Sequence, residues 1–133
     1  MTTAEPYRLL IVDDELTTRK LLRAAAMSNG MVCDLAVNGQ QALSHLETND
    51  YDAVVTDIHM PVVHGHALIV SLLEQPNRPM IVAVTAVEEP RIIKDLIYRG
   101  VDELEFKPLD YELFAIKLSA LLDRKKLRTC PAI

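Results

Sequence analysis

Apolar residues along the chain gather in short runs, separated by stretches in which apolar and polar positions recur with helical spacing. The runs predict strands at 7–12, 31–37, 51–57, 80–84 and 101–106. The first, third and fourth are mostly apolar and end at a polar side chain. A run of this kind is typical of a strand that is buried on both faces of a parallel sheet.

Capping residues and helix breakers mark the segments between the strands. Thr17 or Thr18 is expected to cap the first helix, and Asn29-Gly30 to end it. The other helices are predicted at 38–47 with Asn38 as cap, at 67–74, at 91–99 after Pro90, and at 110–127 with Asp110 as cap. Five strand-then-helix units in succession predict an α/β fold, a parallel sheet with helices on both faces.

Length and composition fit a single domain. The chain has 133 residues, and we expect residues 1–128 to form the domain and 129–133 a flexible tail or linker stub. The net charge of −5 argues against direct nucleic-acid binding by this chain. No apolar run reaches the length of a membrane span, and Cys33 and Cys130 lack zinc-site spacing, so a reducing cytoplasm is the expected setting.

Candidate chemistry gathers where the predicted strands end. Asp57 closes the third strand, while Asp13-Asp14, Thr85 and Lys107 follow the first, fourth and fifth. Parallel strands deliver these residues to one edge of the sheet, where open α/β sheets bind their ligands. Clustered carboxylates repel one another unless a cation such as Mg²⁺ sits among them. A carboxylate can also attack phosphorus and form an aspartyl-phosphate, and Lys107 and Thr85 suit phosphoryl oxygens.

Each of these residues also has an ordinary structural role. An Asp at a strand end is commonly a turn former or helix cap, and Thr85 could cap the following helix. Lys107 could be a solvated surface lysine. Taken singly, the ordinary role is favoured; taken together, it requires four independent coincidences at one edge. The functional interpretation is therefore preferred.

Four motifs carry a resemblance to a known family, and they are Val12-Asp13-Asp14-Glu15, Thr56-Asp57-Ile58-His59-Met60-Pro61 with Gly65, Val84-Thr85-Ala86, and Phe106-Lys107-Pro108-Leu109. In this order, over nearly the whole chain, they resemble the receiver domain of two-component response regulators. The resemblance implies a flavodoxin-like, doubly wound (βα)5 fold, with a five-stranded parallel sheet of order 2-1-3-4-5. It also implies that Asp57 accepts a phosphoryl group from the phosphohistidine of a sensor histidine kinase or a histidine phosphotransfer protein.

The same resemblance implies a metal site. Asp14 and Asp57 would ligate Mg²⁺ (or Mn²⁺) directly, and the backbone carbonyl of His59 would be a third ligand. Asp13 would act mainly through a metal-bound water. The chain would catalyse only its own phosphorylation and dephosphorylation, and would not be an enzyme for other substrates.

Further implications concern the phosphoryl group and the signal. Thr85 and Lys107 would contact phosphoryl oxygens, the Lys107-Pro108 peptide bond would be cis, and Val87 would border the site entrance. Receivers commonly carry an aromatic switch residue three positions before the lysine, and this chain has Leu104 there. We therefore expect the signal to run through the fourth loop and the 91–99 helix. The face formed by 91–106 and 110–127 is a possible homodimer or docking surface.

Several alternatives remain beside this interpretation. His59, His64 and His66 cluster in the sequence and permit a transition-metal site. An FMN-binding flavodoxin would want a Ser/Thr/Gly-rich loop in place of Asp-Asp-Glu. A phosphatase with an aspartyl nucleophile would want a second Asp where His59 stands. A receiver that is never phosphorylated and serves only for docking would not need the complete acid, Thr and Lys set.

Overall fold

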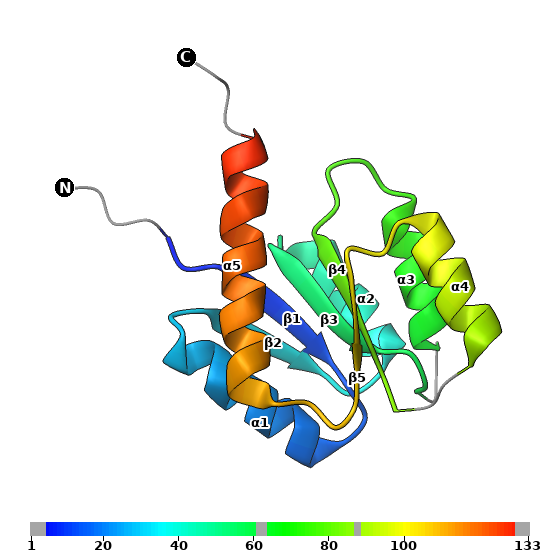
Figure 1. Cartoon of the computed structure of the whole chain (residues 1–133), viewed down its shortest axis with the longest axis horizontal. Coiled ribbons are helices and arrows are strands. Elements are labelled where there is room, and N and C mark those ends of the chain that lie inside the picture. The colour runs from blue at the N-terminus through cyan, green and yellow to red at the C-terminus, as the bar shows by residue number, and fades with distance from the viewer. Residues whose placement is uncertain (1–4, 61–63, 87–88, 130–133) are drawn as a thin grey trace.

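The computed structural model describes residues 5–60, 64–86 and 89–129. In this part of the chain, strands and helices alternate from end to end, as predicted (Figure 1). The strands are β1 (Arg8–Val12), β2 (Val32–Ala36), β3 (Ala53–Asp57), β4 (Met80–Thr85) and β5 (Glu103–Phe106). The helices are α1 (Leu16–Ser28), α2 (Gly39–Thr48), α3 (Gly65–Leu73), α4 (Pro90–Arg99) and α5 (Tyr111–Thr129).

The strands form one parallel sheet of order β2-β1-β3-β4-β5, which confirms the predicted topology. β3 lies at the centre, with Val54 paired to Leu10 of β1 on one side and to Ile81 of β4 on the other. Every residue of β3 is buried. A strand in this position has neighbours on both edges and helices on both faces, which explains its apolar sequence.

Two apolar layers flank the sheet, because successive side chains of a strand point to opposite faces. On one face, Leu9 and Ile11 pack with residues of α1 and α5. On the other face, Leu10 and Val12 pack with residues of α2, α3 and α4. Figure 1 shows α5 and α1 on one side of the strands and α3 and α4 on the other. The resulting sandwich holds the carboxyl ends of the strands at one fixed edge.

Most predicted helix boundaries lie within about two residues of the observed ones, and α3 begins at Gly65, ahead of the predicted start at 67. The Asn38 side chain accepts a hydrogen bond from the backbone N–H of Gln41 at 2.8 Å, and Asp110 caps α5 in the same way. Gly100 ends α4 with φ of +94°, a conformation that glycine adopts without strain. α5 ends at Thr129, so most of the expected tail at 129–133 lies outside the described residues.

The predicted cap of α1 is wrong. The helix begins at Leu16, and Glu15 occupies the capping position without a side-chain hydrogen bond. The carboxylate of Asp13 accepts the N–H of Glu15 at 2.9 Å and fixes the turn before the helix. Thr18 is therefore inside the helix and buried. Among the helices that the structure describes, none combines the length and apolarity required to cross a bilayer.

Candidate functional site

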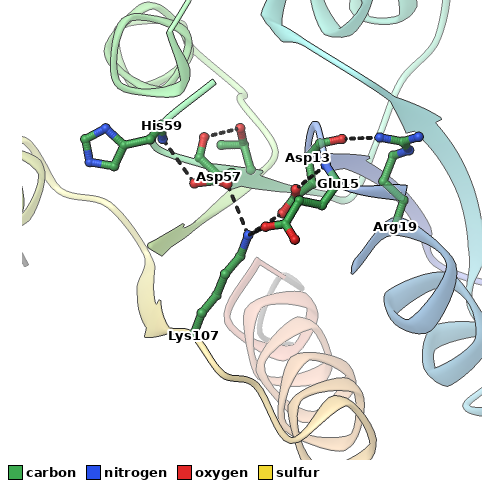
Figure 2. A network of polar contacts seen from close by, with 7 residues as sticks. Asp13, Glu15, Arg19, Asp57, His59 and Lys107 are labelled. Carbon is green, nitrogen blue, oxygen red and sulfur yellow. Dashed lines mark hydrogen bonds and ion pairs between the residues drawn. The ribbon is translucent and has the colours of Figure 1, made fainter. Parts of the chain in front are cut away.

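Asp57 lies where β3 leaves the sheet, and its side chain is almost fully buried. Pairing with β4 continues one residue further, because the N–H of Ile58 donates to the carbonyl of Val84 at 3.0 Å. The chain then turns, and the N–H of His59 donates to Asp57 Oδ1 at 3.0 Å. This bond fixes one carboxylate oxygen and leaves Oδ2 directed toward the rest of the site (Figure 2).

Gly65 explains how α3 can start directly against the end of β3. A Cβ atom at this position would overlap the backbone carbonyl oxygen of Asp57 and crowd Ile58. Only a residue without a side chain allows this approach. Gly65 therefore supports the site from behind, a role that its place in the motif did not reveal.

The first strand delivers two acids to the same edge. Asp13 is buried, its N–H donates to the carbonyl of Ala36 in β2 at 3.1 Å, and its Oδ1 accepts the N–H of Glu15. Asp14 is exposed. Carboxylate oxygens of Asp13, Asp14 and Asp57 lie within 4.8 Å of one another. The predicted cluster of carboxylates is thus present, and these three side chains form the acidic pocket.

Lys107 enters this pocket from the end of β5. Its Nζ lies 2.8 Å from Asp13 Oδ2 and 3.1 Å from Asp57 Oδ2, and 3.5 Å from the more exposed Glu15 (Figure 2). The Lys107-Pro108 peptide bond is cis, as predicted. The ammonium bridges the two buried carboxylates and offsets part of their repulsion.

The charged groups in the pocket shift one another's pKa values. Burial raises the pKa of Asp57, the N–H of His59 and the ammonium of Lys107 lower it, and the charge of Asp13 raises it again, with a net rise. Burial lowers the pKa of Lys107, but its bonds to Asp13 and Asp57 outweigh that effect and raise it. Lys107 is therefore charged, and three carboxylates still face one ammonium. A further cation would be favourable.

The donor set fits a hard divalent cation. Three carboxylates at an open, partly exposed edge provide oxygen ligands and room for water, which suits Mg²⁺. The carbonyl of His59 as an additional ligand stays a prediction. A cation held by Asp14 and Asp57 would compete with Lys107 for the oxygens of Asp57, so the lysine would be free to turn toward an incoming anion.

The three histidines do not gather at one point. His59 Nε2 lies 3.4 Å from Glu89 at the start of α4, and in Figure 2 its ring points away from Asp57. His66 Nε2 lies 2.8 Å from Asp95 Oδ2 on α4, and His64 is exposed before α3. In the part of the chain that the structure describes, the candidate metal ligands that cluster are carboxylates alone. The transition-metal alternative therefore fails.

Thr85 and Leu104 occupy the other half of the edge. Thr85 is fully buried at the end of β4, and its carbonyl accepts the N–H of Lys107 at 2.9 Å. Leu104 pairs with Ala83 in the sheet and packs, half-buried, in the apolar layer that contains Leu96 of α4. An aliphatic side chain thus fills the expected switch position. Val87, the other predicted residue at the entrance, lies outside the described residues.

Two contacts of the site were not predicted from the sequence. The guanidinium of Arg19 on α1 donates to the backbone carbonyl of Asp13 at 2.7 Å, and Glu15 approaches Lys107. Arg19 stands in a helix with Lys20 and Arg23, and no local signal distinguishes it from them. Only the fold shows which of these cations reaches the main chain of Asp13.

Comparison with known proteins agrees with this geometry. The family model described as the response regulator receiver domain matches residues 9–118. The chain belongs to this family. The receiver domain is 28% identical to the transcriptional regulatory protein PcoR of Escherichia coli, over 90% of this chain and 53% of that protein. It is 32% identical to the response regulator MprA of Mycobacterium sp. strain KMS, over 90% of this chain and 52% of MprA.

Other relatives place the receiver domain in a different setting. It is 32% identical to the sensor protein EvgS of Escherichia coli strain K12, over 91% of this chain but 10% of EvgS. The chain thus spans about half the length of PcoR and MprA, and about a tenth of EvgS.

Solved structures support the fold. The receiver domain of the Francisella response regulator 1452 superposes with a TM-score of 0.81 at 24% identity, covering 90% of this chain and 98% of that one. A CheY-like receiver domain protein from Methanospirillum hungatei JF-1 gives 0.86 at 20% identity, covering 92% and 98%.

Proposed function

We propose that this receiver domain takes a phosphoryl group onto Asp57 from the phosphohistidine of a sensor histidine kinase or a histidine phosphotransfer protein, in the cytoplasm and with Mg²⁺ in the acidic pocket. One observation carries the proposal. The Lys107 ammonium bridges Asp13 and Asp57 at a pocket where three carboxylate groups meet. This arrangement supports a role for Asp57 as nucleophile, for the three carboxylates as a cation site, and for Lys107 as a ligand of the phosphoryl group.

The transfer itself needs few parts. Asp57 Oδ2 forms the new O–P bond while the P–N bond to the donor imidazole breaks, and the imidazole keeps the electron pair and takes up a proton. Lys107 turns from the carboxylates to a phosphoryl oxygen, and the Thr85 hydroxyl hydrogen-bonds another. Bound Mg²⁺ would neutralise a third oxygen. Positioning and neutralisation are most of what phosphoryl transfer asks of a protein.

The alternatives have less support. A phosphatase would need a general acid beside the phosphorylated Asp57, and the His59 ring is turned to Glu89 instead. We therefore propose that the chain acts on no external substrate and catalyses only its own phosphorylation and dephosphorylation. A docking domain that is never phosphorylated would have no use for Lys107 held between Asp13 and Asp57.

Phosphorylation is proposed to switch a partner or self-association through the face formed by 91–106 and 110–127. Apolar side chains are exposed there. They are Ile97, Tyr98, Phe106, Leu113 and Ile116. A second copy of the chain and a separate output protein both suit such a face.

Acetyl phosphate with Mg²⁺ provides the test. Wild type is expected to gain one phosphoryl group by intact mass, Asp57→Asn none, and the matched control Asp50→Asn, an exposed acid at the opposite end of β3, the wild-type amount. A wild type that gains no mass would favour the docking-only alternative. Size-exclusion chromatography of the same samples shows whether only the phosphorylated forms self-associate.

A further inference from the structure

The side chain of Arg19 reaches back from α1 to the main chain of Asp13, on the side away from Asp57 and Lys107 (Figure 2). Arg19 lies in the first turns of the helix, where its own N–H donates to the carbonyl of Glu15 at 3.1 Å. Its Nη1 donates to the backbone carbonyl of Asp13 at 2.7 Å (Figure 2). Arg19 is half-buried, so this bond to the carbonyl is partly sheltered from water.

This bond completes the restraint of Asp13. The N–H of Asp13 is bound to Ala36, Oδ1 to the N–H of Glu15, and Oδ2 to Lys107. Its carbonyl, the remaining polar group, is bound to Arg19. Each polar group of Asp13 thus has its own partner, and these partners come from β2, the start of α1 and the end of β5.

The carbonyl of Asp13 belongs to the peptide group that leads to Asp14. A planar peptide group moves as one unit, so holding its oxygen fixes the direction in which Asp14 leaves β1. Among the residues that the structure describes, none donates a hydrogen bond to the Asp14 carboxylate. The approach of Asp14 to Asp57 therefore depends on the backbone that Arg19 holds.

We propose that Arg19 is a positioning residue for the divalent cation, and the proposal rests on the function proposed above. By holding the Asp13–Asp14 peptide group, Arg19 keeps the carboxylate of Asp14 close to that of Asp57. Mg²⁺ demands near-octahedral geometry, so a carboxylate ligand that is poorly held lowers the affinity of the site for Mg²⁺. Groups that orient metal ligands typically contribute about 10- to 100-fold in affinity.

A through-space effect of the Arg19 charge has the opposite sign. A guanidinium near a cation site repels the cation, so removal of the charge alone would tighten Mg²⁺ binding. Positioning predicts weaker binding when the side chain is removed. The direction of the change therefore separates the two roles.

The experiment is a calorimetric titration of the unphosphorylated protein with MgCl₂. Arg19→Met is expected to weaken binding about 10-fold, and Arg19→Lys, which keeps a charged donor on a shorter side chain, to restore part of the loss. Arg23→Met removes the same charge from an exposed position one turn further along α1 and is expected to bind as wild type does. At saturating Mg²⁺, Arg19→Met should approach the wild-type rate of phosphorylation by acetyl phosphate.

The outcomes are separable from those of the proposed function. Wild type that binds Mg²⁺ and becomes phosphorylated, together with Arg19→Met that binds equally well or more tightly, overturns the role of Arg19 alone. Wild type that binds no Mg²⁺ overturns both proposals. If circular dichroism shows that Arg19→Met does not fold, Arg19→Gln, too short to span the same distance, decides by the same comparison.

Discussion

The two halves of the carboxyl edge of the sheet are held in different ways. In the acid half, at β1 and β3, Asp13 and Asp57 are buried and bound by backbone N–H groups, Lys107 and, in the case of Asp13, Arg19. In the response half, at β4, β5 and α4, the helix α4 has one buried side chain, Leu96. Its polar ties to α3 are surface contacts.

These ties centre on Asp95. It lies 2.8 Å from His66 on α3 and 3.0 Å from Arg99 on its own helix, and Arg99 lies 3.9 Å from Glu74. The hydrogen bond from His66, followed by that from Arg99, lowers the pKa of Asp95. Polar contacts at a partly exposed surface contribute little to stability, and the ion pairs of Arg99 are screened by salt.

The difference matches two requirements. Chemistry is served by groups that are fixed before the reaction, whereas a switch needs an element that can move at low cost. We infer that the acid half is built to be rigid and that α4 is the segment that can shift.

Gly65→Ala is expected to damage the acid half most. The added Cβ would overlap the carbonyl oxygen of Asp57, which the buried β3 cannot move away without losing its pairing. Overpacking against a fixed backbone should cost about 3 kcal/mol in the free energy of unfolding, measured by urea titration, and should abolish Mg²⁺ binding. His64→Ala, an exposed neighbour in the same turn, should change little. Equal stability of the two variants would show that α3 can yield.

Asp57→Asn tests the electrostatic strain in the same half. Because burial raises the pKa of Asp57, the unfolded state loses this proton at lower pH than the folded state. The free energy of unfolding therefore decreases as pH rises from about 4 through the higher pKa of the folded state. In the absence of Mg²⁺, Asp57→Asn should melt at a higher temperature than wild type at pH 7.

Two further measurements check the higher melting temperature of Asp57→Asn. The difference from wild type should shrink as the pH falls toward 4, and added Mg²⁺ should raise the melting temperature of wild type more than that of Asp57→Asn, since the cation neutralises the strained carboxylate. Asp50→Asn should show neither effect. A wild type that is the more stable protein at pH 7 would mean that Lys107 fully compensates the burial of Asp57.

The sequence predicts the acid half better than the response half. A carboxylate or lysine at a strand end is fixed by chain order and by the parallel sheet, so the approach of Asp13, Asp14, Asp57 and Lys107 follows from the hydrophobic pattern. Contacts between helices do not. The bond of His66 to Asp95 depends on how α3 packs against α4, which no local pattern specifies.

Local competition explains why the predicted cap of α1 failed. Thr17 and Thr18 are suitable caps, but Asp13 accepts the N–H of Glu15 and the helix starts earlier. The sequence could not distinguish Arg19 from Lys20 and Arg23. All three are cations on α1, and the side that each occupies on the packed helix decides which one reaches Asp13. The close approach behind Gly65 likewise depends on a distance between two elements.

The smallest expected effect concerns Leu104, because the change is a rearrangement within the folded state. The protein is studied with Mg²⁺ and with beryllofluoride as a mimic of the phosphoryl group. Position 104 has no aromatic ring to carry the response, so we expect α4 and Thr85 to carry it. Their backbone amide chemical shifts should therefore change. Shifts in α2, on the far side of α3, should stay close to their values in the free protein. The His66 ring signals should also move if α4 pulls away from α3.

Two variants sharpen this experiment. Leu104→Tyr restores a ring at the switch position and should spread the response into β5, whereas Leu113→Tyr, the same change at an exposed site of α5, should not. Asp57→Asn should show no response to beryllofluoride at all. If wild type binds beryllofluoride while α4 and Thr85 keep their shifts, α4 is not the moving element, and the contrast between a rigid acid half and a mobile response half fails.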